Sequence, residues 1–155
     1  MTAILQCIDA IASTKKALAN YGAMQAIIDH TDQEIKEVYE QMENYRTIVV
    51  DDAFGIRTMQ ADEDDLIRSL DEVALVQKRY EIACHFMMWF QPAWEGLSEN
   101  DRFILQTFYM EDLQNDMMSA VDIIAEKYDL ARTAAYKRKD RAIERLSILL
   151  YGTLC

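Results

Sequence analysis

The chain has 155 residues and a formal net charge of −11, and 51% of its residues are apolar. Its four glycines and one proline are too few for the frequent turns of a strand-rich fold, so we expect an all-α protein. The acidic composition excludes a surface that is basic throughout. Positive charge gathers only in residues 131–155, which hold six basic and two acidic side chains, so only this segment can attract a polyanion.

The cysteines and histidines predict no metal site and no cofactor. Cys7, Cys84 and Cys155 form no C-x-x-C pair, and His30 and His85 are far apart in the sequence. We therefore expect free thiols and a reducing, cytoplasmic setting. The N-terminus lacks the basic region of a signal peptide, and apolar runs such as ACHFMMWF are shorter than a membrane span, so we expect no membrane association.

The first 95 residues are predicted to form a helical, coiled-coil-like domain. A short opening helix is followed by apolar residues at alternating spacings of three and four, which lie along one seam of a helix. The seam comprises Tyr21, Met24, Ile28, Thr31, Ile35, Val38, Met42 and Tyr45. Acidic residues lie between these positions and predict a solvated outer face.

A second long helix is predicted after a turn at DDAFG (51–55). Its seam comprises Leu66, Leu70, Val73, Tyr80, Cys84 and Met87, widened by Val76, Ala83 and Phe90. Two such helices joined by a loop most simply form an antiparallel hairpin. The seams fit an intramolecular bundle and also fit a homodimer. The acidic run 62–65 lacks the glycine and the ligand spacing of a calcium loop, so we interpret it as a solvated helix N-terminus.

The segment WFQPAWEG (89–96) gives the clearest domain boundary. It contains the only proline, Pro92, which is expected to end or kink a helix. We therefore expect a helical domain over residues 1–95 and a DNA-binding domain over residues 96–155. Trp89 and Trp94 are expected to lie in the core rather than to stack on a ligand.

The segment after this boundary has the signals of a helix-turn-helix. Ser98 and Asp101 resemble a capping box at the start of a first helix. The predicted order is then a helix over 121–128, a turn over 128–131, a helix over 132–151 and a C-cap at Gly152. Two helices joined by such a turn match the arrangement in which the second helix enters the major groove of DNA.

The predicted 132–151 helix carries a basic stripe. At about 100° per residue, Thr133, Lys137, Arg141 and Arg145 form an i, i+4 row on one side. The opposite apolar side comprises Ala131, Ala135, Ala142, Leu146 and Leu149. Long cationic side chains on such a row can reach bases or phosphates. The predicted DNA-binding residues are Arg132, Thr133, Lys137, Arg138, Arg141 and Arg145, and a merely solvated charged face is the alternative.

Three motifs in this part of the chain carry a family resemblance. LSENDRFILQTFY is similar to an opening helix of the form L-S-x-x-E-R-x-I-L, IAEKY to IAEEL, and RAIERL to KALRKL. With these motifs, residues 97–152 resemble region 4 of the sigma-70 family, as used in small phage regulators such as the ArpU-type late-gene activators. Arg132 then corresponds to the Arg that opens the recognition helix of the family.

The chain departs from the family pattern at three positions. Asp129 stands where the turn commonly has Gly, although Asp also adopts the left-handed conformation, less readily than Gly. Ala131 replaces a capping Ser, which removes an N-cap hydrogen bond worth about 1 kcal/mol. Arg138 occupies a position that is often apolar. These departures concern the turn and the helix start rather than the motif.

The resemblance implies a sequence-specific DNA-binding transcription regulator of phage or mobile-element origin. Its partners would be double-stranded DNA, RNA polymerase and a second copy bound through the N-terminal helices. Regions 2 and 3 of a full sigma factor are not recognisable, so we expect an accessory regulator. The alternative is a protein-interaction module, an adaptor of the polymerase or sigma/anti-sigma type, without DNA binding of its own. We expect no enzyme, because a Gly-rich phosphate loop, an H-E-x-x-H motif and a paired nucleophile and base are all missing from the sequence.

Overall fold

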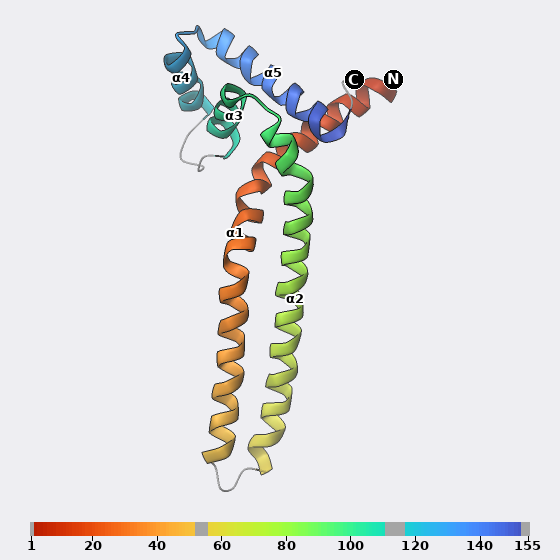
Figure 1. Cartoon of the computed structure of the whole chain (residues 1–155), viewed down its shortest axis with the longest axis vertical. Helices are drawn as coiled ribbons and strands as arrows, with labels where there is room; N and C mark the ends of the chain where they lie inside the picture. The colour runs from red at the N-terminus through yellow and green to blue at the C-terminus, as the bar shows by residue number, and fades with distance from the viewer. Residues whose placement is uncertain (1, 52–55, 111–116, 153–155) are drawn as a thin grey trace. The chain divides into compact units, whose positions relative to one another are not determined.

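The computed structural model describes the backbone of residues 2–51, 56–110 and 117–152, and the side chains of 9–43, 63–110 and 119–152. These residues form helices and contain no strand, which confirms the all-α class (Figure 1). The elements are α1 (Thr2–Asp51), α2 (Ile56–Glu95), α3 (Glu99–Leu105), a π-helical segment (Gln106–Met110), α4 (Met117–Tyr128) and α5 (Arg132–Tyr151). The turn predicted at 51–55 lies, apart from its first residue, outside the described residues.

The chain divides into two compact units. The two-helix unit comprises residues 24–85, and the α5 unit comprises residues 1–23 together with 86–155. The expected boundary at residues 95 and 96 coincides with the end of α2 at Glu95. It falls inside the α5 unit, however, because the first part of α1 and the last part of α2 pack with the C-terminal helices.

In the two-helix unit, the predicted seam of α1 is confirmed from Met24 to Met42, and Tyr45 lies outside the residues whose side chains are described. Thr31 and Val38 are buried, and Met24, Ile28, Ile35 and Met42 are at least half-buried. The predicted seam of α2 is partly wrong. Val73, Val76 and Ala83 are buried, whereas Leu70 and Tyr80 are exposed. Apolar residues occur on more than one side of this helix, so periodicity alone did not identify the buried side.

The core of the α5 unit joins segments from both ends of the chain. Its buried members are Ala17, Leu18, Phe90, Ala93, Leu97, Leu105, Ala142, Ile143 and Leu146. Phe90 is fully buried, with its ring 5.4 Å from the ring of Tyr21 and 5.8 Å from that of Trp94. Burial of an aromatic ring of this size contributes about 1.5–3 kcal/mol. Ala142, Ile143 and Leu146 of α5 belong to the same core, so α5 is held against both long helices.

Pro92 does not end or visibly divide α2, which continues through it to Glu95. The helix stops where Gly96 donates its N–H to the Pro92 carbonyl at 3.1 Å. The expectation that the helix ends at Pro92 is therefore wrong, and α2 ends three residues later, at Glu95. Trp94 packs against the core as predicted, whereas Trp89 is 41% exposed and meets the ring of Tyr151 edge-on.

Candidate nucleic-acid interface

Three residues connect α4 to α5. Asp129 has a φ of 50°, the left-handed conformation that the family resemblance required of an Asp in place of Gly. Leu130 donates its N–H to the carbonyl of Ala125 at 2.9 Å, and Asp129 donates to Glu126 at 3.4 Å. This pair of bonds is the Schellman pattern that closes a helix C-terminus. The turn therefore ends α4 abruptly and lets α5 begin within three residues.

The start of α5 is held by an ion pair to α4 rather than by an N-cap hydrogen bond. Ala131 occupies the N-cap position in an extended conformation and makes no side-chain hydrogen bond. Arg132 instead donates from Nε and Nη2 to Oδ1 of Asp122 on α4, at 3.0 and 2.8 Å. This exposed ion pair joins the two helices across the turn.

A small core fixes the face that α5 presents. Its buried residues come from α3, α4 and α5 and are Ile104, Val121, Ile124 and Ala135. Because Ala135 has no long side chain, the backbone of α5 approaches α4 closely. The side of α5 that carries Thr133, Lys137 and Arg141 is thereby left exposed. The predicted apolar side is confirmed at Ala135, Ala142 and Leu146, whereas Ala131 and Leu149 are exposed.

The predicted DNA-binding residues divide into free and engaged side chains. Within the described part of the chain, Thr133, Lys137 and Arg141 have no hydrogen-bond or ion-pair partner. The guanidinium of Arg138 lies 5.1 Å from the centre of the Tyr128 ring, a cation–π contact that leaves its donors unused. Arg132 and Arg145 are in ion pairs. The free donors thus lie along one row from the start to the middle of α5.

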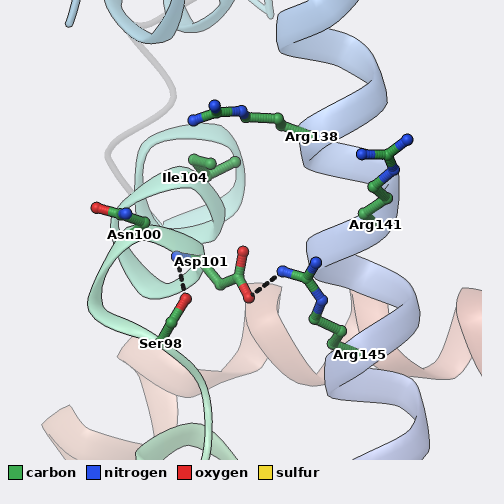
Figure 2. Close-up of a pocket in the computed structure, with 7 residues that line it drawn as sticks. All are labelled: Ser98, Asn100, Asp101, Ile104, Arg138, Arg141 and Arg145. Carbon is green, nitrogen blue, oxygen red and sulfur yellow. Dashed lines mark hydrogen bonds and ion pairs between the residues drawn. The ribbon is translucent and has the colours of Figure 1, made fainter. Parts of the chain in front are cut away.

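Arg145 ties α5 to the start of α3. Its Nη1 donates to Oδ2 of Asp101 at 2.6 Å, and the Asp101 side chain is only 9% exposed. Ser98 accepts the Asp101 N–H at 3.2 Å, so the predicted cap of α3 is present. The reciprocal half of the capping box is replaced, because the Asp101 carboxylate is engaged by Arg145 (Figure 2).

These contacts border an open pocket between α3 and α5 (Figure 2). Its α5 wall carries three guanidinium groups, and its α3 wall carries the first helical turn. The lining residues are Ser98, Asn100, Asp101, Ile104, Arg138, Arg141 and Arg145. Asp101 neutralises one of the three positive charges. The remaining donors of Arg138 and Arg141 can hold a phosphate or the acceptor edge of a base.

Comparison with protein-family models, with curated proteins and with solved structures finds no match to this chain. In the described ranges, no group of His, Cys, Asp and Glu side chains could hold a metal ion. Nor does any helix, as far as its residues are described, have the length and apolar character to cross a membrane.

The sequence pattern did not reveal several residues that shape this surface. Lys139 belongs to the basic cluster but is mostly covered. Its Nζ lies 3.6 Å from Asp140 and within 5.5 Å of the rings of Phe108 and Tyr136. Burial, and to a lesser extent the charge of Asp140, raises the pKa of the Tyr109 phenol. The pairing of Asp101 with Arg145 and of Asp122 with Arg132 had no sequence signal, because residues separated by 44 and 10 positions lie outside any helical repeat.

Proposed function

We propose that α5 is the recognition helix of a sequence-specific, double-stranded DNA-binding transcription regulator. The observation that carries this proposal is the exposed row of Thr133, Lys137 and Arg141, whose donors have no partner among the described residues. A merely solvated helix face would be expected to mix charges of both signs. Here Asp140 and Glu144 lie toward one flank of the row, and among the described residues neither makes an ion pair with Lys137 or Arg141.

The size of the side chains supports major-groove binding. An α-helix fits this groove, and side chains near its start read the base edges. Thr133 and Ala134 at the start of α5 are small, so they would allow the backbone to come close to the bases. Lys137 lies one turn further along and has the length to reach a base or a phosphate.

Phosphate contacts would come from the arginines beside the pocket. Arg138 and Arg141 line it with donors that are free for an anion. Arg132 and Arg145 would act mainly by holding α5 against α4 and α3, through Asp122 and Asp101. Both are half-exposed, so each keeps further donors that could also touch the DNA backbone.

The direct test is selection of duplexes from random or genomic DNA with the purified chain, followed by fluorescence anisotropy on the enriched sequence. We expect Lys137→Ala and Arg141→Ala each to weaken binding by about 1–3 kcal/mol. If a residue contacts phosphate, its variant should also reduce the slope of log affinity against log salt by about 0.9.

Lys36→Ala is the matched control, because Lys36 is an exposed cation of α1 outside the proposed interface. It removes the same charge and should leave affinity unchanged. Equal affinities of the wild type and both α5 variants would contradict the assignment of the site. If no duplex is enriched and the chain instead captures RNA polymerase, the function is that of a protein adaptor.

A further inference from the structure

One side of α2 in the two-helix unit exposes large apolar side chains. Leu75 is 60% exposed and Ile82 is 53% exposed. They are seven residues apart and therefore lie on the same side of the helix, two turns from each other. The neighbouring Val76 and Ala83 are buried, so the core of the unit lies about 100° around the helix from this row. The apolar row has no partner among the described residues.

The charges around Leu75 are arranged symmetrically about it. Asp71 and Lys78 lie on one flank, four residues before and three residues after Leu75. Glu72 and Arg79 lie on the other flank, three residues before and four residues after it. Each flank therefore places an acid before Leu75 and a base after it at nearly equal distances. In the described part of the chain, Asp71, Glu72 and Lys78 have no ion-pair partner.

We propose that a second copy of this chain binds here, with the two α2 helices antiparallel and Leu75 on the two-fold axis. In such a pair the same flanks face each other and the chain directions are opposed. Asp71 then faces Lys78 of the second copy, and Glu72 faces Arg79. The interface is thus self-complementary in charge. A parallel pair in register would bring opposite flanks together, so that Asp71 would face Glu72 of the second copy and Lys78 would face Arg79, and like charges would meet.

The remaining contacts of the antiparallel pair are compatible with this register. Ile82 lies seven residues after Leu75 and meets Arg68, seven residues before it, whose aliphatic stem can cover the exposed side chain. Arg79 already donates to Glu34 of its own chain at 2.9 Å, but both side chains are nearly half-exposed. A guanidinium has five donors, so Arg79 can serve a second carboxylate. This inference does not depend on DNA binding.

The oligomeric state of the full chain is the first test. Analytical ultracentrifugation should give twice the chain mass of 18.0 kDa. Leu75→Glu should give a monomer, because two carboxylates would meet on the axis. Leu70→Glu is the control, since Leu70 is similarly exposed on another side of α2 and should leave the dimer intact. Helicity measured by circular dichroism verifies that both variants fold. A wild type that remains monomeric overturns the proposal.

Charge reversal tests the orientation. Lys78→Asp and Asp71→Lys should each weaken dimerisation by roughly tenfold, since each turns two attractive pairs into repulsive ones. The double variant Asp71→Lys/Lys78→Asp restores both pairs and should dimerise like the wild type. A parallel dimer would behave in the opposite way, because Asp71→Lys would then face Glu72 and Lys78→Asp would face Arg79, and each single change would strengthen dimerisation.

Cysteine cross-linking gives an independent test of the register. With Cys7, Cys84 and Cys155 replaced by alanine, Leu75→Cys should form a disulfide-linked dimer on oxidation. Ile82→Cys should not, because the two copies of this position would be offset by about 21 Å along the helices, whereas a disulfide needs Cα atoms within about 7 Å. Efficient cross-linking at both positions would indicate a parallel pair and overturn the proposal.

Discussion

The two-helix unit and α5 are both amphipathic and highly charged, but they hold their charges differently. Residues 24–85 contain 15 acidic and 6 basic side chains, a net charge of −9, whereas α5 contains 2 and 6, a net charge of +4. In α5 the cations near the two ends, Arg132 and Arg145, are paired with acids of α4 and α3. Charge content alone therefore does not define a binding surface, because some cations hold the helix in place through ion pairs and others have no partner among the described residues.

The largest effect is expected from a residue of α2 that belongs to the α5 unit. Phe90→Ala should destabilise this unit by about 3–5 kcal/mol, because it removes a fully buried ring from the core. The only tryptophans, Trp89 and Trp94, lie in the same unit. Chemical denaturation followed by tryptophan fluorescence therefore reports the stability of the α5 unit directly.

Val76→Ala provides the comparison within the same helix. Val76 is buried in the two-helix unit, and its truncation should change the tryptophan-monitored transition far less than Phe90→Ala does. Duplex binding should be lost in Phe90→Ala at denaturant concentrations at which Val76→Ala still binds. Equal shifts for both variants would show that α2 acts as one cooperative element and that the division at residue 85 has no energetic meaning.

The elements of α5 and its turn could be predicted because their signals are local. Asp129 and Gly152 mark helix ends through backbone conformation and capping, which depend on neighbours within a few residues. The buried side of α2 could not be predicted in the same way. Leu70 and Val73 are both apolar and close in sequence, and only packing against another helix decides that Val73 is buried while Leu70 is exposed.

The same distinction applies to the candidate interface. Helical spacing placed Thr133, Lys137, Arg141 and Arg145 on one row, and nothing in the sequence distinguished one of these side chains from another as a DNA contact. Whether a cation of that row is free depends on acids from other helices, such as Asp101, which lies 44 residues before its partner Arg145. Helical periodicity carries no information about such a pair. Only the folded structure therefore shows that Arg145 is in an ion pair and that Arg141 is not.

An intermediate effect is expected from breaking this pair. Arg145→Ala should destabilise the α5 unit by about 2 kcal/mol, because it leaves the nearly buried Asp101 carboxylate without its partner. The penalty stays below that of a fully buried pair, since the Arg145 side chain is 56% exposed. Arg141→Ala should leave stability almost unchanged, because the Arg141 side chain makes no hydrogen bond or ion pair with the described residues.

A double-mutant cycle sharpens the contrast between the two arginines. Combining Arg145→Ala with Asp101→Ala should cost less than the sum of the single changes, since the second change removes the stranded carboxylate. Urea denaturation followed by tryptophan fluorescence gives all four values. Strict additivity would mean that the 2.6 Å contact contributes little and that Arg145 is as free as Arg141.

The smallest effect concerns the uncapped start of α5. Ala131 has the extended conformation of an N-cap but no side-chain acceptor, so Ala131→Ser should stabilise the α5 unit by about 1 kcal/mol. Ala134→Ser, three residues further on, offers no cap and serves as the control. The same urea measurement would show the gain as a higher midpoint with an unchanged slope.

If Ala131→Ser gives no gain, the Arg132–Asp122 ion pair already holds the helix start, and the added hydrogen bond contributes no further stability. Repeating the substitution in an Asp122→Ala background separates these cases. If the Ser cap stabilises the unit only after the ion pair is removed, the N-cap hydrogen bond and the ion pair both stabilise the start of α5, and either one is sufficient. The start of α5 would then be secured by tertiary contact, as its far end is by Asp101, while Lys137 and Arg141 between them need no partner within the chain.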